Sequence, residues 1–274
     1  MFFVAFSIES VLNISNIFHL WIFIFINMSL KYTHLQDEIK FFNNAKMREK
    51  RKNEQSGLVG HLLPIHAAEM YFSDPTGRVD VSDEIHDVTI LYADIKGFTD
   101  YSAAREPKDV VAMLSALFTK FDKVCVQYHL YKVYTIGDCY VALSFYDKSR
   151  RDKQQEVKNM VNMALAMLQI IREVRQEIKF EGLDMRIGLH TGTIIGGIVG
   201  TDIIRYDVWG RDAIIANKME SEGKQGYINV SESTKNLLEV SFPGEYRFVE
   251  NQVVNLEKFQ IQVPCYFLYA NDQH

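Results

Sequence analysis

Apolar residues follow two spacings that predict strands and helices from residue 57 onward. A nearly continuous apolar run at Val88 to Ile95 (VTILYADI) is typical of a strand that is covered on both faces. Apolar residues three and four positions apart predict a helix that begins at Pro107. The same spacing predicts a longer amphipathic helix over Val157 to Ile178, whose methionines are core residues.

Two further pairs of apolar segments predict paired strands. Tyr131 to Ile136 and Cys139 to Phe145 are strand-like and meet at Gly137-Asp138, a turn-forming dipeptide, which predicts a hairpin. Met185 to His190 and Ile194 to Val199 predict a second strand pair after the long helix.

Shorter elements complete the pattern toward the C-terminus. The segments are strands at Tyr206 to Trp209, Tyr227 to Val230, Tyr246 to Val249 and Cys265 to Leu268, and a helix at Arg211 to Glu222. The order strand, helix, two strands, helix, two strands is the split βαβ pattern. The sequence therefore predicts an α+β fold with a ferredoxin-like βαββαβ core and extra C-terminal strands.

The first residues have a different character. Residues 1–30 carry one formal charge, Glu9, and the segment IFHLWIFIFINM at 17–28 is almost wholly aliphatic and aromatic. A segment of this length and composition predicts a transmembrane helix, and a buried or interfacial helix is the alternative. A cleaved signal peptide is disfavoured because no basic region begins the chain.

A basic segment follows at 31–56, with seven Lys or Arg residues against four acids. Such an excess beside an apolar helix marks the cytoplasmic side of a membrane. We therefore expect a membrane protein with a transmembrane segment at 1–30, a juxtamembrane or signalling helix at 31–56 and a cytoplasmic domain at 57–274. A single apolar helix at the start also fits the tail of a longer membrane protein.

Composition narrows the function classes. The 274 residues are 47% hydrophobic, which excludes intrinsic disorder, and 30 Lys and Arg against 35 Asp and Glu give a net charge of −5. An acidic chain argues against a general nucleic-acid binder, and also against an RNA-binding sheet, which needs aromatic residues among basic ones. Cys125, Cys139 and Cys265 have no zinc-site spacing and no disulfide pattern.

Two acids stand in apolar surroundings and indicate a cation site. Asp94 lies within the first predicted strand, and Asp138 lies at the tip of the hairpin, where Asp is also an ordinary turn residue. A buried carboxylate needs a proton, a cation or a metal. If adjacent strands bring both acids together, their hard oxygens and the oxygens of a phosphate would suit Mg²⁺ or Mn²⁺.

Phosphate-binding candidates lie on either side of these acids. Gly97, Phe98 and Thr99 turn the chain from the first strand toward a helix, where free backbone N–H groups can hold an anion. Arg186 lies in the apolar strand Met185 to Leu189. A buried guanidinium needs an anion, which is either a structural acid or a ligand phosphate, and the sequence leaves both open.

Four motifs occur together: LYADIKGFT (91–99), YKVYTIGDCYVA (131–142), MRIGLHTGTIIGGIVG (185–200) and YDVWGRDAIIANKMES (206–221). In these motifs the chain resembles the dimeric catalytic domain of class III adenylyl and guanylyl cyclases over nearly all of 57–270. The resemblance implies conversion of ATP or GTP to the 3′,5′-cyclic nucleotide and pyrophosphate, for intracellular signalling, with two Mg²⁺ or Mn²⁺ ions.

The resemblance also implies roles for particular residues. Asp94 and Asp138, with Ile95, would bind the metal ions, and Gly97, Phe98, Thr99 and Arg186 would bind the triphosphate. In this family one catalytic domain supplies the metal-binding aspartates. The other supplies an asparagine that positions the ribose and an arginine that stabilises the transition state.

This chain departs from the second set of residues. Ile214 occupies the asparagine position and Lys218 the arginine position, so the chain is most similar to the metal-donating first half of two-domain cyclases. Asp207 and Tyr134 occupy the two base-reading positions, or line a degenerate second pocket, and they leave ATP and GTP open. The usual C-terminal phosphate lysine is replaced by the segment NLEKFQIQVP, with Lys258 as a loose candidate.

We therefore expect a half-site enzyme that pairs with a second cyclase domain, in a heterodimer or within one polypeptide, a homodimer remaining open. The alternative is a catalytically inert dimerisation module, which the residues at 214 and 218 favour and the intact Asp94, Asp138 and Arg186 oppose. His190, which follows a strand, is expected to be a hydrogen-bonded structural histidine.

Overall fold

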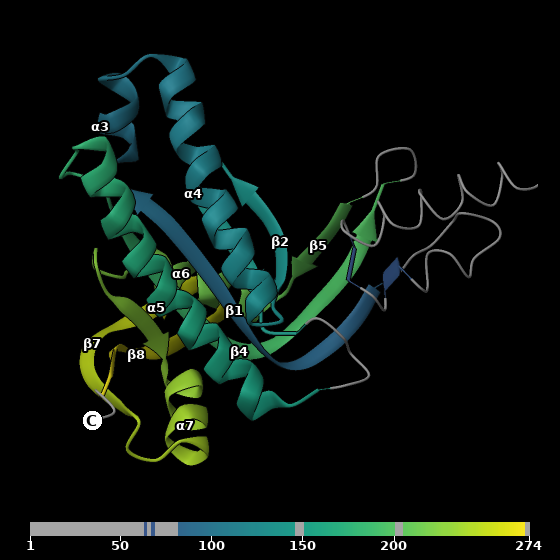
Figure 1. Ribbon diagram of the computed structural model, residues 1–274. Coiled ribbons are helices and arrows are strands. Elements are labelled where there is room, and N and C mark those ends of the chain that lie inside the picture. The colour runs from purple at the N-terminus through teal and green to yellow at the C-terminus, as the bar shows by residue number, and fades with distance from the viewer. Residues whose placement is uncertain (1–62, 65–66, 69–81, 146–150, 201–204, 272–274) are drawn as a thin grey trace, which may run out of the picture. The chain divides into compact units, whose positions relative to one another are not determined.

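The computed structural model describes residues 63–64, 67–68, 82–145, 151–200 and 205–271 (Figure 1). The predicted transmembrane segment at 1–30 and the basic segment at 31–56 lie outside these residues and stay predictions. Among the helices that are described, none has the length and apolar character needed to cross a membrane.

One mixed sheet of eight strands forms the frame of the described residues. The strands are β1 (Ser82–Lys96), β2 (Tyr131–Ile136), β3 (Cys139–Leu143), β4 (Asp184–Val199), β5 (Arg205–Trp209), β6 (Ile228–Ser231), β7 (Tyr246–Leu256) and β8 (Ile261–Ala270). The helices are α3 (Phe98–Ala103), α4 (Pro107–Gln127), α5 (Lys153–Ile178), α6 (Arg211–Ser221), α7 (Glu232–Ser241) and the short 3₁₀ helix η1 (Glu257–Phe259).

The predicted ferredoxin-like core is confirmed by the strand order β2-β3-β1-β4, in which every neighbouring pair is antiparallel. After β4 the sheet continues through β6, β8 and β7, and β5 pairs with the end of β4. The connection from β4 to the parallel strand β6 includes α6. The predicted C-terminal strands are therefore present, and they extend the same sheet.

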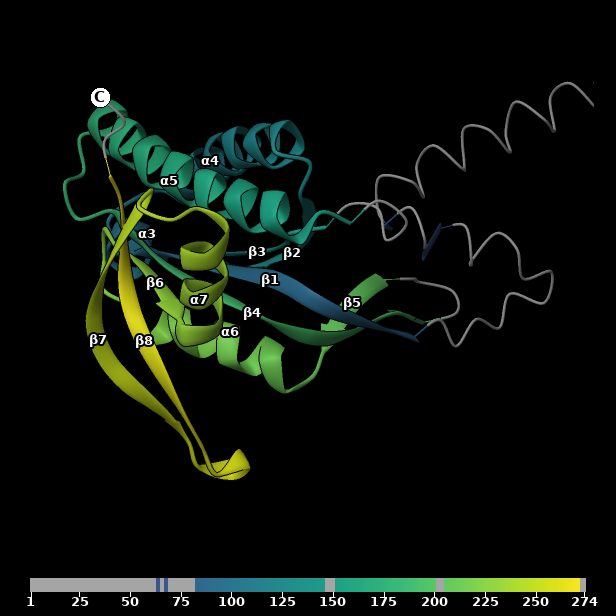
Figure 2. The same ribbon diagram turned by 90° about the horizontal axis from the view of Figure 1, so that it is seen from below.

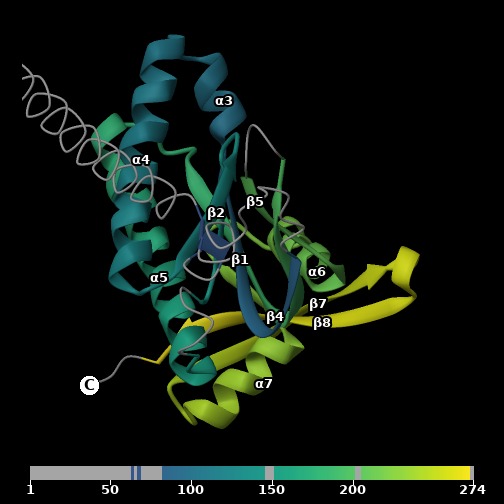
Figure 3. The same cartoon turned by 90° about the vertical axis from the view of Figure 1, so that its right-hand side faces the viewer.

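The long helices α4 and α5 cover one face of the sheet, and α6 lies on the opposite face (Figures 2 and 3). Alternation along β1 sends Leu91, Ala93 and Ile95 toward α4 and α5, where they are buried in the main hydrophobic core. Tyr92 and Asp94 consequently point to the other face. The polar candidates lie on that face. Helix α6 lies against β4 and, to a smaller extent, against β1, and leaves β2 and β3 less covered.

The sequence of each long helix explains how it begins. Pro107 is at the first turn of α4, where its missing N–H is not needed. Asp152 caps α5 by accepting a hydrogen bond from the Gln155 backbone N–H. The predicted buried stripe of α5 and the core role of its methionines are confirmed, since Met160, Met163 and Met167 are inaccessible to solvent.

One predicted strand pair is wrong. Met185 to His190 and Ile194 to Val199 form the single strand β4, which pairs with β1 from Lys96 to Ser82. The intervening Thr-Gly-Thr segment resembles a turn in composition, but the hydroxyls of Thr191 and Thr89 lie 2.9 Å apart across the strands. This buried polar contact and the length of β1 keep the strand continuous.

Candidate active site

Asp94 lies at the centre of the candidate site because of its register in the sheet. Its direct neighbours are Cys139 on β3 and Arg186 on β4. Asp138 precedes Cys139 at the hairpin turn, so the fold brings together the three residues that the sequence singled out. Directly opposed residues have side chains on the same face, which allows Asp94 and Arg186 to pair.

Arg186 is bound by two carboxylates. Its Nη2 lies 2.9 Å from Asp94 Oδ2 and 2.7 Å from Glu220 Oε1 of α6. The Glu220 side chain is only 7% exposed, against 23% for Asp94. In the described residues the anions beside Arg186 are therefore the carboxylates of Asp94 and Glu220, and its predicted contact with a ligand phosphate stays a prediction.

The sequence analysis missed Glu220. Burial raises the pKa of its carboxyl above the ordinary value, and the attraction of Arg186 offsets this only in part. A signal for its burial exists in the helix periodicity, since Glu220 follows Ala213 and Ala216 at spacings that place all three on one side of α6. Its ionic partner depends on how α6 packs and cannot be inferred from that spacing.

Asp138 lies close enough to Asp94 to be affected by its charge. Partial burial and the nearby negative charge of Asp94 raise the pKa of the Asp138 carboxyl. A hard divalent cation bound between the two carboxylates would relieve the repulsion that Asp138 experiences. The Ile95 side chain is buried in the core, so its backbone carbonyl is the only group it can offer to such a cation. Within the described part of the chain, no three His, Cys, Asp or Glu side chains form a metal-binding cluster.

The predicted phosphate-binding turn follows β1 directly. Gly97 has φ +80°, and a Cβ atom there would lie 2.2 Å from the Gly182 carbonyl oxygen, so both the conformation and the space require glycine. Phe98 and Thr99 then begin α3. This places the backbone N–H groups of the turn at the same end of β1 as Asp94.

Tyr134 and Asp207, the two predicted base-reading residues, lie near each other, and Tyr92, which was not predicted, lies beside them. Tyr92 on β1 and Tyr134 on β2 both stand opposite Val141 of β3, and the Tyr92 hydroxyl donates a hydrogen bond to Tyr134. Burial raises the pKa of both tyrosines, and the negative charge of Asp207 contributes to each. Asp207 is itself oriented by Arg205, whose Nη2 lies 2.6 Å from its Oδ2.

Ile214 and Lys218 lie one helical turn apart on α6. Ile214 is 45% exposed, and Lys218 pairs loosely with Glu222, the nitrogen and oxygen being 3.8 Å apart. Ile214 and Lys218, which differ from the family's asparagine and arginine, thus face solvent, whereas Glu220 of the same helix faces Arg186. Lys258 lies in η1, at the tip of the β7–β8 hairpin, which extends away from α4 and α5 (Figure 2).

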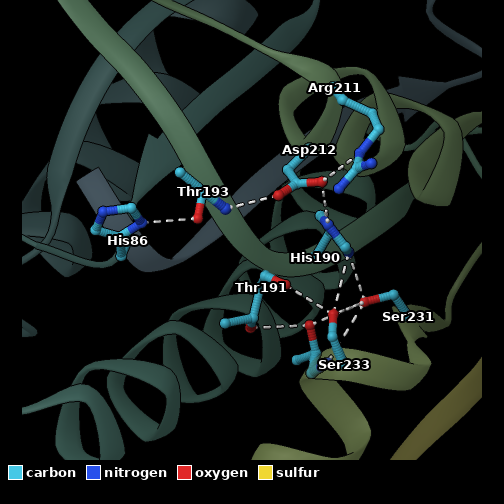
Figure 4. Close-up of polar contacts among 9 residues, drawn as sticks. His86, His190, Thr191, Thr193, Arg211, Asp212, Ser231 and Ser233 are labelled. Carbon is cyan, nitrogen blue, oxygen red and sulfur yellow. Dashed lines mark hydrogen bonds and ion pairs between the residues drawn. The ribbon is translucent and has the colours of Figure 1, made fainter. Parts of the chain in front are cut away.

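The structural role expected of His190 is confirmed. His190 Nδ1 lies 2.8 Å from Ser231 Oγ, and Nε2 lies 3.5 Å from Asp212 Oδ1 (Figure 4). Asp212 Oδ2 also accepts a hydrogen bond from the Thr193 backbone N–H at 2.6 Å. His190 is 6% exposed, its Nε2 has no hydrogen bond among the described residues closer than this contact with Asp212, and the network joins β4, β6 and α6.

Comparison with known proteins places this chain in a family. Residues 81–270 match the family described as adenylate and guanylate cyclase catalytic domain. The chain is 38% identical over 253 residues to "Guanylate cyclase" from Toxoplasma gondii, covering 90% of this chain and 6% of that protein. It is 36% identical over 223 residues to "Guanylate cyclase alpha" from Plasmodium falciparum, covering 80% of this chain and 5% of that protein. The chain therefore spans a small part of the length of these relatives.

Solved structures give the same assignment. The guanylate cyclase domain of RhGC from Catenaria anguillulae, determined in complex with GTP, matches with 26% identity and a TM-score of 0.60, over 69% of this chain and 100% of that chain. The adenylyl cyclase CyaB from P. aeruginosa shares the fold, with a TM-score of 0.64 and 23% identity, over 70% of this chain and 98% of that chain.

Proposed function

The chain belongs to the adenylate and guanylate cyclase catalytic domain family, and from this premise we propose that it is the metal-donating half of a nucleotide cyclase. The proposed reaction converts a purine nucleoside triphosphate to the 3′,5′-cyclic nucleotide and pyrophosphate. One observation carries the proposal: Asp94, Asp138 and Arg186 come together on the less covered face of the sheet, and the pKa of Asp138 is raised there.

Asp94 and Asp138 are the carboxylates proposed to bind two Mg²⁺ or Mn²⁺ ions, with the backbone of Ile95. When bound, such ions would lower the pKa of the ribose 3′ hydroxyl and stabilise charge on the leaving pyrophosphate. The turn at Gly97, Phe98 and Thr99 would orient the triphosphate through backbone N–H groups. Arg186 would neutralise negative charge on its phosphate oxygens through bidentate hydrogen bonds.

The same proposal assigns the other half of the reaction to a second cyclase domain. Ile214 has no polar group to position a ribose, and Lys218 lacks the planar guanidinium fork that binds a transferring phosphate. The partner would supply the asparagine and the arginine. Tyr134 and Asp207 would line the second pocket between the two domains. The names of the relatives make GTP the first substrate to test, beside ATP.

We further propose that the enzyme acts at the cytoplasmic face of a membrane, in intracellular signalling. The apolar segment at 1–30 and the basic segment at 31–56 support this placement. A relative from Dictyostelium discoideum, 33% identical over 225 residues, is named "Guanylyl cyclase, membrane".

An inert dimerisation module is the second candidate. The exposed Ile214 and Lys218 favour it, because no polar catalytic pair stands at these positions on α6. The two candidates differ in one property: only the enzyme half needs Asp94 for turnover.

Restoring the missing pair in the chain itself tests the proposal without knowledge of the partner. We expect the wild-type chain alone to form little cyclic nucleotide from GTP or ATP with Mn²⁺. Ile214→Asn with Lys218→Arg should raise turnover at least about tenfold, because each half of a homodimer would then supply both sets of residues. Adding Asp94→Asn to this variant should abolish the gain.

Mixing provides the matched control. The triple variant lacks a metal-binding aspartate, and the wild type lacks the catalytic pair, so neither alone should turn over, whereas the mixture should. Brisk turnover by the wild type alone would reject the need for a partner. If none of the proteins or mixtures formed cyclic nucleotide, and no Mn²⁺ binding depended on Asp94, the inert module would be favoured.

A further inference from the structure

Arg186 is a cation held between two anions of different accessibility. Asp94 lies at the less covered face and is 23% exposed, whereas Glu220 is 7% exposed beneath α6. The same Nη2 atom serves both carboxylates, at 2.9 Å and 2.7 Å. Because Asp94 Oδ2 already accepts this hydrogen bond, a metal ion that used the same oxygen would have to displace Arg186.

We propose, on the basis of the function proposed above, that Arg186 is the resident counter-ion of Asp94 and gives way to a divalent cation. Glu220 is then the positioning residue that keeps Arg186 beside the site when Asp94 changes partner. Without metal, Arg186 neutralises Asp94. With metal, Arg186 stays paired to Glu220 and turns its free donors to the triphosphate.

The packing of α6 fixes Glu220 in this role. A Cβ atom at Gly188 would lie 2.1 Å from the Glu220 backbone nitrogen, so glycine there allows the helix backbone to contact β4 directly. Gly188 is two residues from Arg186, which places both on the same face of the strand. The Glu220 backbone is therefore held against the strand that carries its partner, and its side chain has little freedom to leave.

Arg186 also has donor capacity to spare. Its Nε is buried and has no hydrogen-bond partner among the described residues. A buried guanidinium nitrogen without an acceptor is costly, and a phosphate oxygen could satisfy it once Arg186 has given up its contact with Asp94.

A direct electrostatic effect of Glu220 on the bound cation is the simpler alternative. Glu220 could strengthen cation binding only because its negative charge lies near the site, without acting through Arg186. A double-mutant cycle distinguishes the two, since an effect transmitted by Arg186 disappears when Arg186 is replaced, and a direct charge effect does not.

The experiment measures the dissociation constant of Mn²⁺ alone for the full chain, from the electron paramagnetic resonance signal of free Mn²⁺. Glu220→Gln should raise this constant about tenfold, because Arg186 then competes for Asp94 as its remaining partner. Arg186→Gln should lower the constant. In the Arg186→Gln background, Glu220→Gln should change it less than about twofold. The proposal would be overturned if Glu220→Gln weakened Mn²⁺ binding equally in the wild-type and Arg186→Gln backgrounds, or changed it in neither.

A control variant and a measurement of folding show whether a change in Mn²⁺ binding is specific to Glu220 and Arg186. Glu177→Gln removes an exposed carboxylate that pairs with Lys120 and should leave Mn²⁺ binding unchanged. Near-ultraviolet circular dichroism reports folding of each variant. If Arg186→Gln does not fold, because Glu220 is left buried without a cation, the double variant decides. Its dissociation constant should be lower than that of Glu220→Gln, and an equal or higher value would reject the proposal.

Failure of the proposed function would look different. Asp94→Asn should abolish Mn²⁺ binding if Asp94 is a metal ligand. If wild-type binding does not depend on Asp94, the metal site itself is wrong. If binding depends on Asp94 but the cycle shows no coupling, only the role of Glu220 is wrong.

Discussion

Two polar clusters lie between strand β4 and helix α6, and their carboxyl groups are perturbed in opposite directions. At one end of α6, Asp212 contacts His190; at the other, Glu220 contacts Arg186. Burial by itself would raise the pKa of Asp212, but hydrogen bonds from His190 and the Thr193 N–H outweigh it and lower the pKa to about 2. For Glu220, burial outweighs the attraction of Arg186, and the pKa is raised.

The difference distinguishes a structural cluster, around Asp212, from the cluster around Glu220 that is proposed to be functional. The Asp212 carboxylate is more stable in the folded protein than in water, so the fold gains from its charge. The Glu220 carboxylate, like that of Asp138, is less stable when charged, so the fold loses from it. Charges that destabilise the fold are typical of sites where a bound ligand of opposite charge compensates them. The two glycines that let α6 contact β4, Gly188 and Gly192, serve one cluster each.

The largest expected effect tests the functional cluster. Asp138→Asn should reduce turnover roughly a thousandfold, about 4 kcal/mol of barrier, in the chain that carries Ile214→Asn and Lys218→Arg. The reason is the loss of one of two metal-binding carboxylates. The free energy of unfolding should not fall, because the raised pKa shows that charge at Asp138 is disfavoured in the folded state.

Cyclic nucleotide formation and urea unfolding, measured on the same preparations, check this prediction. The comparison would break down if Asp138→Asn lost stability in proportion to its activity. Asp138 would then be a structural turn residue, which is the ordinary role of Asp in a hairpin.

The next effect tests the structural cluster. His190→Ala should lower the free energy of unfolding by about 2–3 kcal/mol, because it leaves Asp212 and Ser231 buried with fewer hydrogen bonds. Affinity for Mn²⁺ should stay within about twofold in the folded protein. Urea unfolding and Mn²⁺ titration measure the two properties.

A second histidine provides the matched control. His86 is exposed and lies 3.2 Å from Thr193 Oγ1, on the other side of the same strand segment (Figure 4). His86→Ala should change the free energy of unfolding by less than about 0.5 kcal/mol. Equal losses at His86 and His190 would show that burial does not distinguish them.

These clusters show where prediction from the sequence succeeded. The ferredoxin-like core, the hairpin and the long helix followed from apolar spacing, which depends on local alternation alone. Asp94 and Asp138 could be singled out because an acid within or beside an apolar strand is unusual, and the structure brings them close together, while their role as metal ligands stays a prediction. His190 could be predicted as structural, and the network with Asp212 and Ser231 confirms it.

Prediction failed where the answer depends on contacts distant in the sequence. The Thr-Gly-Thr segment of β4 continues as a strand because β1 pairs with it along its length, and local composition carries no trace of that pairing. Helix α7 was missed altogether. The contacts of Arg186 with Asp94 and Glu220 depend on the register with β1 and on the packing of α6, which only the folded chain defines.

The smallest expected effect is a difference in pH dependence. The pKa of Asp212 is lowered from 3.8 to about 2, so its ionisation stabilises the fold by about 2 kcal/mol above pH 4. This contribution is lost as the pH falls from about 4 toward about 2. The stability difference between wild type and Asp212→Asn should therefore be largest at neutral pH and shrink below pH 4, in urea unfolding measured from pH 7 to pH 3.

The opposite sign is expected for the functional cluster. The raised pKa of Asp138 means that its charge costs stability once the pH exceeds the folded pKa, so Asp138→Asn should be at least as stable as wild type at neutral pH. That advantage should shrink as the pH falls and the carboxyl is protonated in both states. If both variants lost stability in the same pH range and with the same sign, the two clusters would not differ in kind. Stability differences of opposite sign would support the view that the Asp212 cluster stabilises the fold, whereas the charge of Asp138 is compensated only when a ligand binds.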